Sequence, residues 1–361
     1  MRIAFASTPV GALGSGVGGG VELTLHSLAT GLTGLGHAVE VFAPAGSVLN
    51  SSSEYRIIIH QIDGALQTPA QDVDRRSSNA EIKGSVLANI WERIIEQQDR
   101  FDVVLNFAYD ELPMRLTDLL RAPVVHLVSM ASLTDAMDDV IVRTSLKNAV
   151  AVAMHSHAQA ATFLGLSQSV RIVGSGIEIE KYVFNENQNG PLGFVARISP
   201  EKGFDDAVAV AARTNLPLNV WGLMQDEEYF KQALERHPEA VVNYEGFVSS
   251  NELARVLGSC RAVLVTSKWV EAFGNVVIES LACGVPVVAY RRGGPAEIVR
   301  NGQTGFVVDP DDIEQIVGAV NRIGEISRAE CRDSALENFS VQAFTRRVEN
   351  WLVDRVAQMR Q

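Results

Sequence analysis

Two carboxylates eight positions apart, Glu271 and Glu279, stand in a stretch whose pattern predicts a strand, a loop and a helix. Glu271 lies in the predicted loop, and Glu279 lies in the first turns of the helix, which Asn275 is placed to cap. A loop carboxylate can accept hydrogen bonds from vicinal sugar hydroxyls, and a helix carboxylate can accept a pair from ribose hydroxyls. Glu279 could instead be an ordinary exposed residue. A carboxylate surrounded by apolar residues needs a polar partner, however, and the neighbours of Glu279 are apolar: Val277, Ile278, Leu281 and Ala282.

The predicted loop meets the helix at Phe273, Gly274, Asn275 and Val276. The first N–H groups of a helix have no partner within it, and the helix end carries a partial positive charge. This junction therefore favours a phosphate or a sugar hydroxyl.

Two cations, Arg197 and Lys202, stand in the segment GFVARISPEKGFDDAV, the first at the end of a buried-type strand and the second just before a helix. In an open α/β sheet, a loop at the carboxyl end of a strand faces the ligand crevice. Arg can grip two phosphate oxygens, and Lys supplies a compact charge. Either residue alone fits a solvated surface cation, whereas the two together favour a diphosphate ligand.

A glycine-rich loop, GSGVGGG, follows the first predicted strand. Gly14, Gly16 and Gly19 have the G-x-G-x-x-G spacing, and Glu40 follows at roughly the dinucleotide distance, so an NAD-dependent oxidoreductase is one hypothesis. In that fingerprint the first glycine ends the strand, whereas here Ser7 ends it and Gly14 comes seven residues later. The match to the fingerprint is therefore weak.

Three successive glycines, Gly18, Gly19 and Gly20, precede a helix predicted to start near Val21. Glycine allows backbone N–H groups to approach an anion at a helix N-terminus. We expect this loop to face an anion, and a plain flexible connection is the alternative.

Short apolar runs alternate with amphipathic stretches along the chain, a pattern typical of parallel sheets covered by helices on both faces. The predicted strands are 2–7, 38–44, 101–107, 122–128 and 151–156, then, after the polar segment NENQNGP, 192–198, 218–222, 241–248, 261–267, 285–290 and 305–308. The restart predicts two doubly wound domains, residues 1–175 and 176–340. A final amphipathic helix, about 341–361, is expected to pack back towards the first domain.

Composition excludes several classes of protein. The 361 residues carry a formal charge of −12, which argues against nucleic acid as a principal partner. Three cysteines without metal-ligand spacing fit a reducing cytoplasm. No run approaches the roughly 20 apolar residues of a membrane span, and the acidic excess in residues 1–170 does not favour peripheral contact with anionic lipids.

These motifs together resemble the retaining GT-B glycosyltransferases of glycosyltransferase family 4, glycosyl transferases group 1, over nearly the whole chain. ARISPEKG is similar to that family's Arg-x4-Lys phosphate loop, and Glu271 to Glu279 to its Glu-x7-Glu motif. The segment GGGVELTLHSLATGLTGLGHAVEVFAP resembles its glycine loop and first helix, and AVAMHSHAQAATFLGL its strand-and-serine motif. The linker departs from the usual pattern, with Gly174-Ser175-Gly176 where Pro-Asn-Gly is commoner.

The resemblance implies two Rossmann-like domains facing a central cleft, with the nucleotide-sugar donor on residues 176–340. It implies that Arg197 and Lys202 stabilise the leaving diphosphate, that Glu271 orients the sugar and that Glu279 holds the ribose. The remaining donor-site residues implied are Gly19, Gly20, Phe247, Val248, Phe273, Gly274, Asn275 and Val276.

The resemblance also places His126, in APVVHLVSM, against the donor sugar. Taken alone, a histidine in an apolar run is more often a hydrogen-bonded core residue.

The predicted function is transfer of a sugar, with retention, from a nucleoside-diphosphate sugar to the hydroxyl of a small or soluble acceptor. UDP is favoured on family frequency, and neither a metal nor a cofactor is expected to be required. The alternatives are the NAD-dependent oxidoreductase and a non-catalytic nucleotide-sugar binder.

Overall fold

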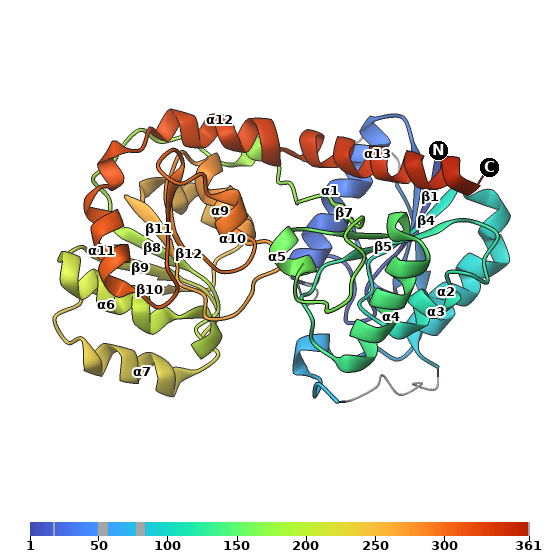
Figure 1. Ribbon diagram of the computed structural model, residues 1–361, viewed down its shortest axis with the longest axis horizontal. Coiled ribbons are helices and arrows are strands. Elements are labelled where there is room, and N and C mark those ends of the chain that lie inside the picture. The colour runs from blue at the N-terminus through green and yellow to red at the C-terminus, as the bar shows by residue number, and fades with distance from the viewer. Residues whose placement is uncertain (17–18, 50–56, 77–83, 360–361) are drawn as a thin grey trace. The chain divides into compact units, whose positions relative to one another are not determined.

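The computed structural model describes residues 1–16, 19–49, 57–76 and 84–359 of the chain, which divides into two units (Figure 1). Unit 1 contains the described part of Met1–Gly176 together with helix α13 (Val341–Met359). Unit 2 is Ile177–Ser340.

Unit 1 is built on a seven-stranded parallel sheet with the order β3-β2-β1-β4-β5-β6-β7. In register, Asn106 of β4 lies opposite His126 of β5. The strands are β1 (Arg2–Ala6), β2 (Ala38–Pro44), β3 (Ile58–Ile62), β4 (Val103–Asn106), β5 (Val124–Val128), β6 (Val152–Met154) and β7 (Arg171–Ile172).

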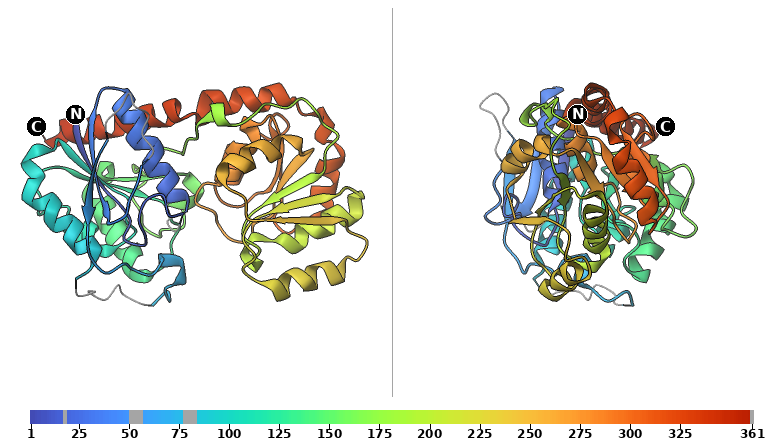
Figure 2. Two further views of the ribbon diagram at one scale, coloured as in Figure 1. Left: turned by 180° about the vertical axis from the view of Figure 1, so that it is seen from behind. Right: turned by 90° about the vertical axis from the view of Figure 1, so that its left-hand side faces the viewer.

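Alternate side chains of these strands enter different apolar layers, as a sheet covered on both faces requires. Ile3 and Phe5 pack with α1 (Gly20–Gly34) and α13, whereas Ala4 and Ala6 pack with α2 (Val86–Gln97). Figure 2 shows α1 lying along the sheet of unit 1. The other α-helices described in this unit are α3 (Glu111–Leu116), α4 (Asp135–Lys147) and α5 (His157–Ala160).

Unit 2 is built on a six-stranded parallel sheet with the order β10-β9-β8-β11-β12-β13 around one apolar core. Its strands are β8 (Leu192–Val195), β9 (Leu218–Trp221), β10 (Val242–Gly246), β11 (Ala262–Val265), β12 (Val287–Tyr290) and β13 (Gly305–Val308). Its α-helices are α6 (Phe204–Thr214), α7 (Glu227–Arg236), α8 (Ser250–Val256), α9 (Asn275–Ala282), α10 (Pro295–Ile298), α11 (Ile313–Asn321) and α12 (Arg328–Phe339).

Both sheets are doubly wound, because the strand order reverses once in each: between β1 and β4 in unit 1, and between β8 and β11 in unit 2. The prediction of two Rossmann-like α/β domains is confirmed. The structure adds β3 and β7 at the edges of the first sheet, which the apolar pattern did not indicate. In such sheets, ligands bind outside the carboxyl ends of the strands at the point of reversal.

Candidate functional site

The reversal point of unit 2 carries the cations and carboxylates that the sequence singled out. The segment after β8 contains Arg197 and ends in the 3₁₀ turn Pro200–Lys202. The segment after β11, the neighbouring strand, contains Glu271 and leads into α9. Two loops separated in sequence are therefore side by side at the carboxyl edge of the sheet.

Lys202 and Glu271 form an ion pair in these loops, with 2.5 Å between Nζ and Oε1. The side chains are only 15% and 12% exposed. Ser267 also donates to Oε1, at 2.7 Å, and so does the indole N–H of Trp269, at 3.4 Å. Nζ of Lys202 lies 4.9 Å from the centre of the Trp269 ring, a cation–π distance.

The electrostatics of this pair favour a charged carboxylate. Burial acts to raise the pKa of Glu271, but Lys202, Ser267 and Trp269 outweigh it and hold that pKa below its usual value. All three described contacts reach Oε1. Within the described chain no donor is bonded to Oε2, which is therefore available to a ligand hydroxyl.

Arg197 lies near this pair in sequence, but its described contacts are to other side chains. Its guanidinium donates to Gln225 at 3.0 Å and to Glu201 at 3.5 Å, and the side chain is 36% exposed. Ser199 donates to the same oxygen of Glu201 at 2.7 Å. Arg197 thus presents a partly exposed cation beside the Pro200–Lys202 turn.

Glu279 is buried in α9 and 7% exposed, and its partner is one that the sequence did not indicate. The hydroxyl of Tyr182 donates to Oε1 of Glu279 at 3.1 Å. Burial raises the pKa of Glu279, and the bond from Tyr182 opposes that rise only in part. The predicted need for a partner is met within unit 2 by a tyrosine 97 positions away.

The junction at the start of α9 differs in one respect from the prediction. Asn275 does not cap the helix: Gly274 is the N-cap, with φ +99°, and no side chain caps the N-terminus. Because a residue with a Cβ rarely adopts that φ, glycine takes the N-cap position and Asn275 becomes the first helical residue. The segment from Phe273 to Val276, which contains the N-terminus of α9, begins two residues after Glu271.

Phe247 and Val248 follow β10, the edge strand two places from β8. Phe247 is 75% exposed, and Val248 packs partly against the core. No described contact joins these two residues to Lys202 or Glu271. The exposed ring of Phe247 therefore lies at the end of a different strand of the same sheet from the ion pair.

Comparison with known proteins agrees with this architecture. Residues 177–355 match the family described as Glycosyl transferases group 1. The glycogen synthase of Mycobacterium tuberculosis (strain ATCC 25618 / H37Rv) is 31% identical over 170 residues, which are 44% of this chain and 40% of the synthase. The chain thus matches about two fifths of the length of this curated relative.

Solved structures match over almost the entire chain. Anabaena Alr3699/HepE in complex with UDP superposes with a TM-score of 0.76 at 20% identity, covering 98% of this chain and all of that one. Sucrose-phosphate synthase from Thermosynechococcus elongatus gives a TM-score of 0.71 at 19% identity, covering 100% and 98%. The chain has the GT-B fold.

The family match begins at Ile177, the first residue of unit 2, and includes Arg197, Lys202, Glu271 and Glu279. Among the described helices, none is both long and apolar enough to cross a membrane.

The glycine loop of this GT-B chain binds a carboxylate of its own. Glu22, in the first turn of α1 and 8% exposed, accepts from the backbone N–H of Gly14 at 2.9 Å and of Gly16 at 3.3 Å. Gly19 is the N-cap of α1, with φ +55°, and Gly20 is its first residue. Gly18, the third glycine of the predicted anion loop, lies outside the described residues.

His126 lies inside unit 1, where its side chain has no exposed surface. Asn106 donates to its Nδ1 at 3.2 Å, and its Nε2 is 2.7 Å from the hydroxyl of Thr117. Burial, with a smaller effect of Arg355, lowers the pKa of His126 to about 3, so the ring is neutral. In this conformation His126 is a hydrogen-bonded core residue of unit 1, and its contact with a donor sugar stays a prediction.

Another histidine of unit 1, His155, lies just after β6 at the carboxyl end of that strand. Its Nδ1 lies 2.6 Å from the carbonyl oxygen of Gly174, and its Nε2 lies 3.1 Å from Oγ of Ser129, just after β5. Sequence reasoning missed this pair, because the two residues come together only when β5 and β6 lie side by side.

Proposed function

We propose that this chain is a retaining glycosyltransferase that moves a sugar from a nucleoside-diphosphate sugar, preferably a UDP-sugar, to a hydroxyl of a small or soluble acceptor. The observation that carries the proposal is the buried Lys202–Glu271 pair at the reversal point of unit 2. The family match over residues 177–355 supports it, as do the Alr3699/HepE complexes with UDP and with UDP-glucose.

The two members of the pair take different parts of the donor. An ammonium has three donors, so Lys202 can keep its bond to Glu271 while it binds an oxygen of the leaving diphosphate. Oε2 of Glu271 accepts a hydroxyl of the transferred sugar. The pair thereby contacts both the sugar and the leaving diphosphate. Lys202 stabilises the negative charge that develops on the diphosphate as its bond to the sugar breaks.

Further donor contacts are assigned to unit 2. Arg197 supplies a second cation to the diphosphate, together with the uncapped N-terminus of α9. Glu279 binds the ribose hydroxyls, while its Oε1 accepts the hydrogen bond from Tyr182. The main chain around Phe247 and Val248 binds the base. Retention is proposed from the motif resemblance, and we assign no protein nucleophile.

We propose that the donor needs no metal or other cofactor, because Lys202 and Arg197 supply the positive charge. Two pairs of adjacent carboxylates, Asp205-Asp206 and Asp138-Asp139, are candidate metal ligands by residue type, and both have cationic partners. Asp206 pairs with Lys268 at 2.7 Å, and Asp138 pairs with Arg75 at 3.1 Å. Activity that survives a chelator is therefore expected.

The oxidoreductase hypothesis is disfavoured by the geometry of the glycine loop. Two amides of the G-x-G-x-x-G spacing already bind the carboxylate of Glu22, which would repel a pyrophosphate at the same place. We place the protein in the cytoplasm, on the basis of its three cysteines, which are all free and buried.

The test is a panel of nucleotide sugars with purified protein, scored by nucleotide release with EDTA present. We expect release from at least one UDP-sugar, abolition by Lys202→Ala, and a product of unchanged anomeric configuration by NMR. Tight nucleotide-sugar binding without release or transfer would identify a binder, and NADH binding by ultraviolet titration would revive the oxidoreductase.

A further inference from the structure

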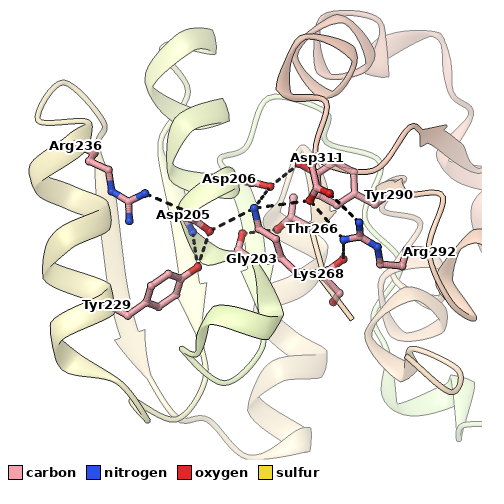
Figure 3. Close-up of polar contacts among 11 residues, drawn as sticks. Gly203, Asp205, Asp206, Tyr229, Arg236, Thr266, Lys268, Tyr290, Arg292 and Asp311 are labelled. Atoms are coloured by element: carbon pink, nitrogen blue, oxygen red, sulfur yellow. Dashed lines mark hydrogen bonds and ion pairs between the residues drawn. The ribbon is translucent and has the colours of Figure 1, made fainter. Parts of the chain in front are cut away.

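A second charged cluster lies beside the Lys202–Glu271 pair in unit 2, centred on Lys268 (Figure 3). Nζ of Lys268 is 2.7 Å from Asp206, 3.9 Å from Asp205 and 3.8 Å from Asp311. Asp205 and Asp206 are in the first turn of α6, and Asp311 follows β13. One ammonium therefore ties together three segments at the carboxyl edge of the sheet.

The three carboxylates have other partners, which balance their charge. Arg236 lies 3.6 Å from Asp205, and Arg292 lies 2.8 Å from Asp311. Two tyrosine hydroxyls, those of Tyr229 and Tyr290, donate to Asp205 and Asp206, each at 2.6 Å. Three cations thus match three anions, so the cluster has no net charge with which to attract a further ion. Its role is to connect the segments that carry it.

The main chain of Lys268 belongs to the loop that holds Glu271. Its neighbours Ser267 and Trp269 both donate to Glu271, while the Lys268 side chain extends to Asp206. The backbone N–H of Lys268 donates to the carbonyl oxygen of Glu201 at 2.8 Å, one residue before Lys202. Lys268 therefore joins the Glu271 loop to the Lys202 turn through its backbone and to α6 through its side chain.

Close packing makes these two segments sensitive to small shifts. The hydroxyl of Thr266 donates to the carbonyl oxygen of Gly203 at 2.7 Å. A Cβ on Gly203 would lie 2.0 Å from the carbonyl oxygen of Thr266. On the other side of the loop, Arg292 donates to the carbonyl oxygen of Ser267 at 3.1 Å.

We propose that Lys268 is a positioning residue that holds Lys202 and Glu271 in their reactive geometry, an inference that rests on the proposed function. Without the Lys268 ammonium, less positive charge offsets the repulsion between Asp311 and the carboxylates of Asp205 and Asp206. Repulsion then moves the start of α6, and with it the turn that carries Lys202, away from Glu271. A displacement of about 1 Å can lower a rate by about a hundredfold.

The test compares Lys268→Met and Lys268→Arg with the wild-type protein, using steady-state kinetics for the donor and hydrogen exchange over residues 199–206 and 266–274. Lys231→Met is the matched control, because Lys231 is 64% exposed on α7 and its ion pair with Glu227 spans 3.8 Å. We expect Lys268→Met to lower kcat by about ten- to a hundredfold, with a smaller change in donor KM and faster exchange in both segments. Lys268→Arg should keep a kcat close to that of the wild-type protein, and Lys231→Met should have wild-type kcat and exchange.

Unchanged kcat in a folded Lys268→Met protein would overturn the positioning role, as would a loss that arginine does not restore. If Lys268→Met does not fold, Asp206→Asn takes its place, since it breaks the 2.7 Å ion pair between Lys268 and α6 with little change of shape. Because this variant also removes one of the repelling carboxylates, a loss of kcat at the lower end of the range for Lys268→Met is expected. If the wild-type protein turns over no donor at all, the proposed function fails. Exchange in residues 199–206 then decides alone whether Lys268 holds the Lys202 turn.

Discussion

Replacing Lys202 by methionine should lower both the free energy of unfolding and the turnover. The Glu271 carboxylate, which is only 12% exposed, then has no cation as a partner. Removing one partner of a buried ion pair costs about 3–5 kcal/mol, and the slight exposure of this pair places the expected loss near the lower limit. Turnover should fall by about 10²- to 10³-fold, the typical effect of losing one group that stabilises developing charge.

The destabilisation should depend on pH in a defined direction. In the wild-type protein the pKa of Glu271 is lowered, so its contribution is complete above the unfolded value and is lost as pH falls through the lower folded pKa. Without Lys202, burial dominates and raises the pKa of Glu271 above the unfolded value. The variant then regains stability as pH falls through that raised pKa, and its deficit relative to wild type narrows from pH 7 towards pH 5.

Urea unfolding at both pH values measures these effects in the wild-type protein, Lys202→Met, and the double variant Lys202→Met/Glu271→Gln. The double variant should recover about 2 kcal/mol, a typical coupling energy for two residues in contact. Lys181→Met is the control, since Lys181 is 51% exposed in its pair with Glu178 and should lose under about 1 kcal/mol. Equal losses in Lys202→Met and Lys181→Met, or no recovery in the double variant, would refute the reasoning.

Three further predictions concern other parts of the two units. Glu279→Ala should raise donor KM more than it lowers kcat, because ribose contacts are alike in ground and transition states; a defect in kcat alone would place Glu279 in the chemistry. Gly274→Ala should lower stability by about 1–3 kcal/mol in thermal unfolding, given φ +99° and a proline ring carbon 2.8 Å from the new Cβ; an unchanged Tm would contradict this strain. Glu22→Ala should speed hydrogen exchange at the two glycine amides it binds, and unchanged exchange would show that the carboxylate does not hold them.

Most of the strands that could be predicted from the sequence are buried on both faces, although β10, a largely exposed edge strand, was also predicted. β5 reads VVHLV and β11 reads AVLV, and every residue of both is buried. β3 was missed because IIHQI at the sheet edge is partly exposed and mixes polar with apolar residues. β7 has only two residues, too few for any periodic pattern.

The site was predictable at the level of loops and not of contacts. The sequence placed Glu271 in a loop, Lys202 just before a helix and Arg197 at the end of the strand 192–198. In the structure β8 ends at Val195, so Arg197 lies in the segment that follows it. The sequence could not show that Lys202 and Glu271 pair, since 69 positions separate them. Partners such as Tyr182 depend on packing in the same way. Asn275 as a cap was a wrong choice between adjacent residues that both suit helix starts.

The packing of α13 on unit 1 gives the protein an order of assembly during synthesis. Phe344, Val348 and Trp351 of α13 are buried in the unit 1 core, and the Trp351 indole N–H donates to Val150 at 2.6 Å. These residues are translated only after all of unit 2. At about 5–20 residues per second, the ribosome spends on the order of ten to thirty seconds on that interval. During this time the first-made domain has an uncovered apolar face along α1, on which a chaperone can act before α13 arrives.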